Sequence, residues 1–125
     1  MVKRVAIIGA GSWGTTVATL IAEKVPTVLW ARDEKVVSGL LSNSRNDRYL
    51  PDFELPKSLY ATSDLSEAVS EADLLFLAIP THGLRLTVEE IANCIKGVPS
   101  IISLTKGFEL GTHLRMTQII QSIMP

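Results

Sequence analysis

Three glycines near the start of the chain have the spacing of a phosphate-binding turn. Gly9, Gly11 and Gly14 form the pattern G-x-G-x-x-G directly after the apolar residues 5–8, and a helical pattern follows them. In such a turn the first glycine permits a tight bend, the second leaves the backbone open to a pyrophosphate, and the third lets the helix pack closely on the strand. The helix then directs its N–H groups and positive dipole end at the phosphates. The pattern in this context predicts a dinucleotide site; the alternative is a set of ordinary turn glycines.

Two basic residues follow later strand-like runs. Arg32 lies just beyond residues 27–30, where NAD-selective folds commonly place an acidic residue. A guanidinium there can stack on adenine or pair with a 2′-phosphate, so we expect NADP to be accepted. Lys106 follows residues 100–104 and could bind an anionic group or polarise an oxygen. The alternative for Arg32 is a solvated surface residue next to Asp33, which would serve only as a helix cap. The alternative for Lys106 is a surface lysine in a turn.

Four further residues carry groups that could take part in binding or catalysis. The backbone N–H groups of Ser12 and Trp13, inside the glycine turn, could bind pyrophosphate oxygens. His82 follows a strand-like run but has no carboxylate neighbour in the sequence, which disfavours a catalytic role. Cys94 lies between apolar residues at helical spacing and is interpreted as a packing residue.

Apolar runs alternate with helical patterns along the whole chain. This alternation predicts an α/β fold, a Rossmann-type doubly wound parallel sheet in the order 3-2-1-4-5. The loops after the first, second, fourth and fifth strands would then meet at one edge, where ligands bind. Asp64 and Glu67 have the spacing of a capping box at a helix start. Residues 43–58 have the pattern of a long surface loop. Residues 74–79 are continuously apolar, which predicts a strand buried on both faces. The expected strands are residues 5–8, 27–30, 59–62, 74–79 and 100–104, and the first helix is expected to end near residue 24.

Composition narrows the class of protein. The chain has 125 residues, 46% of them hydrophobic, and a formal net charge of −1, which predicts a single packed domain without the basic excess of a nucleic-acid-binding protein. No stretch approaches the roughly 20 apolar residues of a membrane span. Cys94 is the only cysteine, which excludes an internal disulfide and fits a cytoplasmic location.

Six motifs together resemble the bacterial-type NAD(P)-dependent glycerol-3-phosphate dehydrogenases. They are GAGSWGT at 9–15, WARD at 30–33, RYLP at 48–51, ATSDL at 61–65, AIPTHGLR at 78–85 and SLTKGFE at 103–109. The resemblance implies an oxidoreductase that transfers hydride between NAD(P)H and dihydroxyacetone phosphate, giving sn-glycerol 3-phosphate for phospholipid synthesis. It assigns cofactor contacts to Ser12, Trp13 and Arg32, places Tyr49 close to the cofactor, and gives Lys106 contacts to both cofactor and substrate. With the glycines, the predicted cofactor residues are Gly9, Gly11, Ser12, Trp13, Gly14, Arg32, Tyr49 and Lys106; no metal is expected.

The resemblance also implies a further part of the protein. Members of the family continue into an all-helical domain, which carries the lysine taken as the acid/base and an Arg-Asn pair that grips the substrate. We therefore expect residues 1–125 to be the N-terminal NAD(P)-binding domain of a longer two-domain enzyme, with no catalytic residue of its own and little or no activity alone. A sheet that ends at its fifth strand leaves an edge and an apolar surface, which predicts association into a homo-oligomer.

Two other functions stay open at this stage. One is a different reductase of the same fold, such as a ketopantoate reductase or a 3-hydroxyacyl-CoA dehydrogenase, against which the S-W-G and T-K-G motifs argue. The other is a stand-alone nucleotide-sensing module without catalysis. Such modules typically keep an acidic residue after the second strand, where this chain has Arg32.

Overall fold

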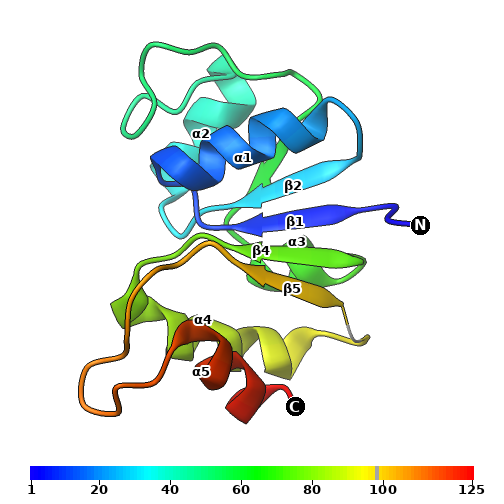
Figure 1. Cartoon of the computed structure of the whole chain (residues 1–125). Coiled ribbons are helices and arrows are strands. Elements are labelled where there is room, and N and C mark those ends of the chain that lie inside the picture. The colour runs from blue at the N-terminus through cyan, green and yellow to red at the C-terminus, as the bar shows by residue number, and fades with distance from the viewer. Residues whose placement is uncertain (98) are drawn as a thin grey trace.

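A parallel sheet forms the centre of the computed structural model, which describes residues 1–97 and 99–125. Within those residues the sheet has five strands in the order β3-β2-β1-β4-β5 (Figure 1). This is the predicted Rossmann-type order. All the strands run parallel, and the order in which they are added reverses between β1 and β4, which creates a switch point at their carboxyl ends. The strands are β1 (Val5–Ile8), β2 (Thr27–Trp30), β3 (Tyr60–Thr62), β4 (Leu74–Leu77) and β5 (Ser100–Ser103).

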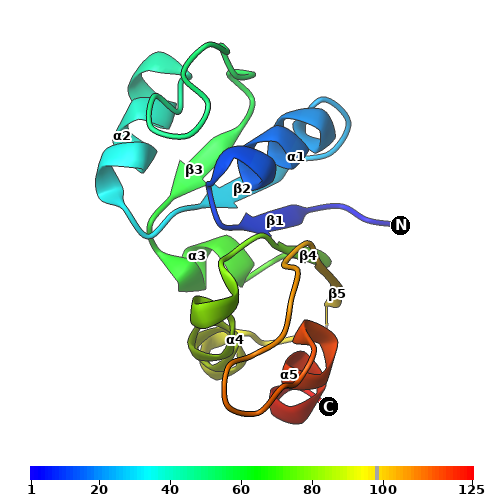
Figure 2. The ribbon, with the colours of Figure 1, turned by 60° about the vertical axis from the view of Figure 1, so that its left-hand side comes forward.

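Helices cover the sheet from both sides. On one face lie α1 (Ser12–Ala22) and α2 (Glu34–Asn43); on the other lie α3 (Leu65–Val69), α4 (Thr81–Cys94) and α5 (Met116–Ile123) (Figures 1 and 2). Right-handed crossovers between parallel strands produce this division. The central strand β1 serves both layers because its side chains alternate: Val5 and Ile7 pack toward α1 and α2, and Ala6 and Ile8 pack toward α4 and α5.

The ends of the elements differ slightly from the predicted ones. Asp33 caps α2 as predicted, accepting a hydrogen bond from the Lys35 amide at 2.9 Å. The capping box at Asp64 and Glu67 is only half right. Asp64 accepts from the Glu67 amide, but the Glu67 carboxylate accepts from the hydroxyls of Tyr60 at 2.7 Å and Thr62 at 3.1 Å instead of returning to the helix start. The first helix also ends at residue 22, two residues earlier than predicted.

The prediction that β4 is buried on both faces is correct for one face and wrong for the other. Leu75 and Leu77 are completely buried against α4 and α5. Leu74 and Phe76 are only half-buried, because α1 and α2 lie over β1, β2 and β3 and leave this part of the sheet open. Ile102 on the neighbouring edge strand β5 is 41% exposed. The structure thus places an open apolar surface on β4 and β5; self-association through it stays a prediction.

The segment at residues 43–58 is more than a surface loop. It begins as the end of α2, and its later part packs onto the α1 and α2 layer. Leu55 is buried, and so is the polar side chain of Asn46. The prediction missed this because the segment lacks the periodic apolar pattern that indicates burial.

Candidate functional site

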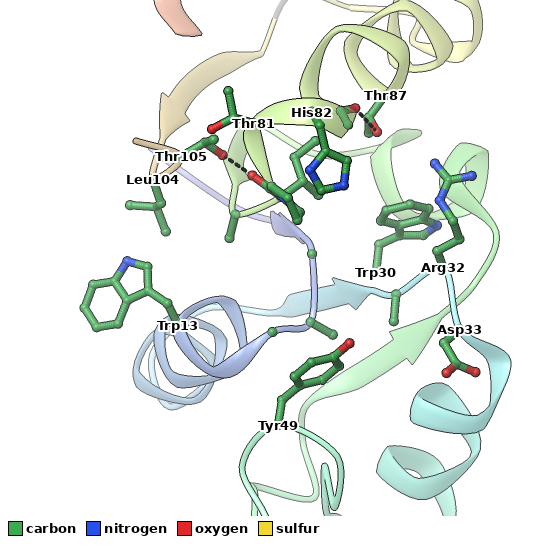
Figure 3. A pocket seen from close by; sticks show the side chains of 18 of the residues that line it. Trp13, Trp30, Arg32, Asp33, Tyr49, Thr81, His82, Thr87, Leu104 and Thr105 are labelled. Carbon is green, nitrogen blue, oxygen red and sulfur yellow. Dashed lines mark hydrogen bonds between the residues drawn. The ribbon is translucent and has the colours of Figure 1, made fainter. Parts of the chain in front are cut away.

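The carboxyl ends of the strands open into a cavity of about 760 Å³ (Figure 3). It lies at the switch point between β1 and β4, and its size is within the range of small-molecule and cofactor sites. The four loops that the sequence placed at this edge do meet there. The lining comprises residues 9–11 and 13 of the glycine turn, residues 30–33 and 36 after β2, Tyr49, residues 78–83, 86 and 87 around the start of α4, and residues 104–106 after β5.

The glycine turn combines two packing positions with one open position. Gly9 has φ +117°, and a Cβ there would collide with the carbonyl oxygen of Ala78. A Cβ on Gly14 would collide with the carbonyl oxygen of Gly9, so α1 can approach β1 closely only without a side chain. A Cβ on Gly11, by contrast, would meet no atom within 4 Å, and Gly11 lines the cavity. Gly11 therefore leaves an open cradle beside the N-terminus of α1, whose first N–H groups have no acceptor within the helix.

A buried asparagine ties the glycine turn to the loop after α2. Asn46, 1% exposed, donates from Nδ2 to the carbonyl oxygen of Ala10 at 2.8 Å and to Oγ1 of Thr15 at 2.9 Å. Its Oδ1 accepts from the amide of Tyr49 at 3.2 Å. Ser12 adds a second tie by donating from Oγ to the carbonyl oxygen of Tyr49 at 2.6 Å. Tyr49 is thereby held at the cavity wall, and sequence reasoning had given Asn46 no role.

Six of the eight predicted cofactor residues line this cavity. They are Gly9, Gly11, Trp13, Arg32, Tyr49 and Lys106. Gly14 lies behind the turn, in the packing role already described. The hydroxyl of Ser12 is engaged with Tyr49, which leaves its backbone N–H at the start of α1 as the group that could face a ligand. Cofactor binding by all eight residues stays a prediction.

At one side of the cavity Arg32 lies on an aromatic ring. Its guanidinium carbon is 5.3 Å from the ring centroid of Trp30, and its Nη2 is 3.7 Å from Oε2 of Glu90 in α4. Trp30 is buried and donates from Nε1 to the carbonyl oxygen of Ser63 at 3.0 Å, so the ring is a fixed platform. Figure 3 shows Arg32 and Trp30 together on the side of the cavity away from Leu104.

At the other side the Lys106 loop is fastened to α4. The hydroxyl of Thr81 donates to the carbonyl oxygen of Lys106 at 2.9 Å. Arg85 grips Glu109 with two hydrogen bonds of 2.8 Å each, and Thr112 donates to the same carboxylate at 2.6 Å. The bonds from Arg85, then those from Thr112, lower the pKa of Glu109 from 4.5 to about 2. Lys106 is exposed and lines the cavity from this fastened loop.

His82 and Cys94 have simpler surroundings. His82 is exposed at the cavity wall (Figure 3), and within the described part of the chain no carboxylate pairs with its imidazole. Cys94 is half-buried against the core, where burial raises the pKa of its thiol, as expected of a packing residue. In residues 1–97 and 99–125 no group of three His, Cys, Asp or Glu side chains is placed to hold a metal ion, and no helix has the length and apolarity to cross a membrane.

Comparison with known families shows which family the chain resembles. Residues 4–125 match the family described as NAD-dependent glycerol-3-phosphate dehydrogenase N-terminus. The chain belongs to this family. The resemblance inferred from the motifs at 9–15, 30–33 and 103–109 is thus confirmed at the level of the family.

Proteins similar in sequence are named glycerol-3-phosphate dehydrogenases. The chain is 44% identical over 122 residues to a glycerol-3-phosphate dehydrogenase [NAD(P)+] of Sphingopyxis alaskensis and 40% identical over 123 residues to one of Mycobacterium avium. Each alignment covers 98% of this chain but only 37% and 36% of the relative, so the chain spans little more than a third of their length.

Solved structures show the same arrangement of elements. A glycerol-3-phosphate dehydrogenase of Coxiella burnetii superposes with a TM-score of 0.89 at 27% identity, over 97% of this chain and 37% of that chain. A glycerol-3-phosphate dehydrogenase from yeast (Saccharomyces cerevisiae) gives a TM-score of 0.85 at 26% identity, over 96% of this chain and 38% of that chain. The predicted Rossmann-type fold is therefore confirmed by topology and by likeness.

Proposed function

We propose that residues 1–125 form the NAD(P)-binding domain of a two-domain glycerol-3-phosphate dehydrogenase. The reaction is a reversible hydride transfer between NAD(P)H and dihydroxyacetone phosphate, giving sn-glycerol 3-phosphate for phospholipid synthesis. The proposal extends to a cytoplasmic enzyme whose partners are these small molecules. Its support from the comparisons is the family match over residues 4–125 and the names of the relatives.

The observation that carries the proposal is the open cradle at Gly11. Gly11 lines the cavity and has open space at its Cβ position, beside a helix N-terminus and at the switch point of a parallel sheet. Such a glycine suits the backbone approach of a pyrophosphate. Arg32 offers a positive charge at one side of that cavity, and the loop carrying Lys106 closes the other. The residues present therefore fit a dinucleotide.

Each side of the cavity would make a different contribution. When bound, the reduced nicotinamide cofactor supplies the hydride. The amides of Ser12 and Trp13 would hold the pyrophosphate, and Arg32 on its Trp30 platform would take the adenosine end. Tyr49, held by Asn46, would fix the wall next to the glycine turn.

Lys106 would serve the substrate as well as the cofactor. Its ammonium could anchor the phosphate of dihydroxyacetone phosphate or polarise the carbonyl oxygen, where negative charge develops during reduction. Thr81 and the Arg85–Glu109 pair would keep its loop in place during the reaction. The acid/base group is proposed to lie in the remaining two thirds of the enzyme, so residues 1–125 alone would bind cofactor with little or no turnover.

An activity screen of the protein as its gene encodes it tests this proposal. Dihydroxyacetone phosphate should cause oxidation of NADH or NADPH, and sn-glycerol 3-phosphate should drive the reverse reaction. Ketopantoate and acetoacetyl-CoA serve as matched control substrates for the other reductases of this fold. Activity on a control substrate but not on dihydroxyacetone phosphate would refute the assignment, and cofactor binding without any activity would favour a nucleotide-sensing module.

A further inference from the structure

A carboxylate from α4 faces the arginine at the adenosine side of the cavity. Oε2 of Glu90 lies 3.7 Å from Nη2 of Arg32. The two side chains are 41% and 65% exposed, so both remain open to a ligand. Arg32 is also positioned by its contact with the buried Trp30 ring, 5.3 Å away. The pair is thus a defined arrangement, with Arg32 on the cavity wall and Glu90 directly beside it.

Asp33, the residue that follows Arg32, already has partners for both of its carboxylate oxygens. In Rossmann folds that prefer NAD, an acidic residue after β2 accepts hydrogen bonds from the ribose hydroxyls and repels a 2′-phosphate. Asp33 lies at that place in the sequence, but one of its oxygens accepts from the Lys35 amide and the other pairs with Arg48 at 2.9 Å. The carboxylate beside Arg32 therefore comes from a different element, α4.

We propose that Glu90 is a specificity-determining residue that disfavours NADPH relative to NADH. This inference rests on the proposed function, because it assumes that the ribose of a dinucleotide reaches Arg32. A 2′-phosphate of charge about −2 paired with Arg32 must approach the Glu90 carboxylate. The 2′-hydroxyl of NADH brings no charge and can donate a hydrogen bond to it. Arg32 and Glu90 thus act in opposite directions on NADPH.

The expected size follows from Coulomb repulsion. A phosphate on the far side of the Arg32 guanidinium would lie roughly 7 Å from the Glu90 carboxylate, where water-like screening leaves a repulsion equivalent to about a 3- to 10-fold loss of affinity. Because both groups are partly exposed, dissolved salt should reduce the effect. Removing the charge of Glu90 should consequently strengthen NADPH binding most at low ionic strength.

Titration of NADH and NADPH into the protein as its gene encodes it tests the inference. Glu90→Gln should lower the Kd of NADPH about 3- to 10-fold while the Kd of NADH stays equal or rises. Glu89→Gln is the matched control, because Glu89 is the preceding, exposed residue of the same helix and makes no ion pair with Arg32 in the described structure. The ratio of the two Kd values should be unchanged in this control.

Three outcomes would overturn the inference. If the NADPH-to-NADH ratio of Glu90→Gln equals that of wild type or of Glu89→Gln, Glu90 does not discriminate, while the proposed function stands. If Glu90→Gln weakens both cofactors equally, the residue only positions Arg32. If the wild-type protein binds neither cofactor, the proposed function is refuted and this inference with it.

Discussion

Replacing Asn46 should destabilise the fold, because its buried side chain joins the loop after α2 to the glycine turn. Asn46 is 1% exposed and makes three hydrogen bonds, to Ala10, Thr15 and Tyr49. Asn46→Ala removes all three and leaves the buried carbonyl of Ala10 and the amide of Tyr49 to find water or stay unsatisfied. At about 1 kcal/mol for each bond, the free energy of unfolding should fall by about 2–4 kcal/mol.

The isosteric variant Asn46→Asp separates lost hydrogen bonds from lost volume. It keeps the acceptor for the Tyr49 amide but replaces the two donated bonds with a carboxylate oxygen that faces the carbonyl of Ala10. At neutral pH it should be at least as destabilised as Asn46→Ala. Burial raises the pKa of such a carboxyl in the folded state, so its protonated form is favoured by folding. Its deficit relative to wild type should therefore shrink as the pH falls.

Urea denaturation measures both effects. Asn43→Ala is the control, because Asn43 is exposed in the same segment and its replacement should change the free energy of unfolding by no more than about 0.5 kcal/mol. Asn46→Ala should also weaken NADH binding, since Tyr49 and the glycine turn lose their common tie. The reasoning is refuted if Asn46→Ala is no less stable than Asn43→Ala.

Three further changes test the two sides of the cavity. The pKa of Glu109 is lowered from 4.5 to about 2, so its bonds with Arg85 stabilise the fold above about pH 4.5 and are lost as the pH falls toward about 2. Glu109→Gln should therefore remove this part of the acid unfolding curve. Glu54→Gln is the control, because Glu54 is exposed and its replacement should leave the curve unchanged. Arg32→Ala should weaken NADPH by about 1–3 kcal/mol in a titration if the guanidinium meets the 2′-phosphate. Equal weakening of NADH and NADPH would indicate stacking on adenine instead, and no change in either would remove Arg32 from the site. Lys106→Ala should lower kcat/KM for dihydroxyacetone phosphate about 10- to 100-fold in steady-state kinetics while the protein stays folded, and an unchanged value would exclude the lysine from the substrate site.

The architecture was predictable because its signals are local. Short apolar runs between helical patterns define parallel strands, and right-handed crossovers leave few orders for them. The glycine spacing marked the turn because each of its positions has a separate steric requirement, which the structure shows at Gly9 and Gly14. The position of Arg32 and Lys106 followed from strand ends alone.

What the sequence could not reveal depends on contacts between distant segments. Nothing distinguishes Asn46 from Asn43 in the sequence, since burial of Asn46 arises only when its loop folds onto α1. The pairing of Arg32 with Glu90 joins the loop after β2 to α4, and no spacing rule links the two residues. The half-buried side of β4 was missed for the same reason, because a continuous apolar run does not reveal which face a helix will cover.

Titration of NADH into wild type, Gly11→Ala and Gly97→Ala tests the central claim most directly. A Cβ meets no atom at either glycine, so both variants should fold with the stability of wild type. Gly11 lines the cavity and Gly97 does not, so we expect only the Cβ at Gly11 to obstruct the pyrophosphate. We predict that wild type and Gly97→Ala bind NADH with the same Kd and that Gly11→Ala binds at least about tenfold more weakly, the equivalent of 1.4 kcal/mol. Equal Kd values for all three proteins, or no binding by wild type, would contradict a dinucleotide site at this turn.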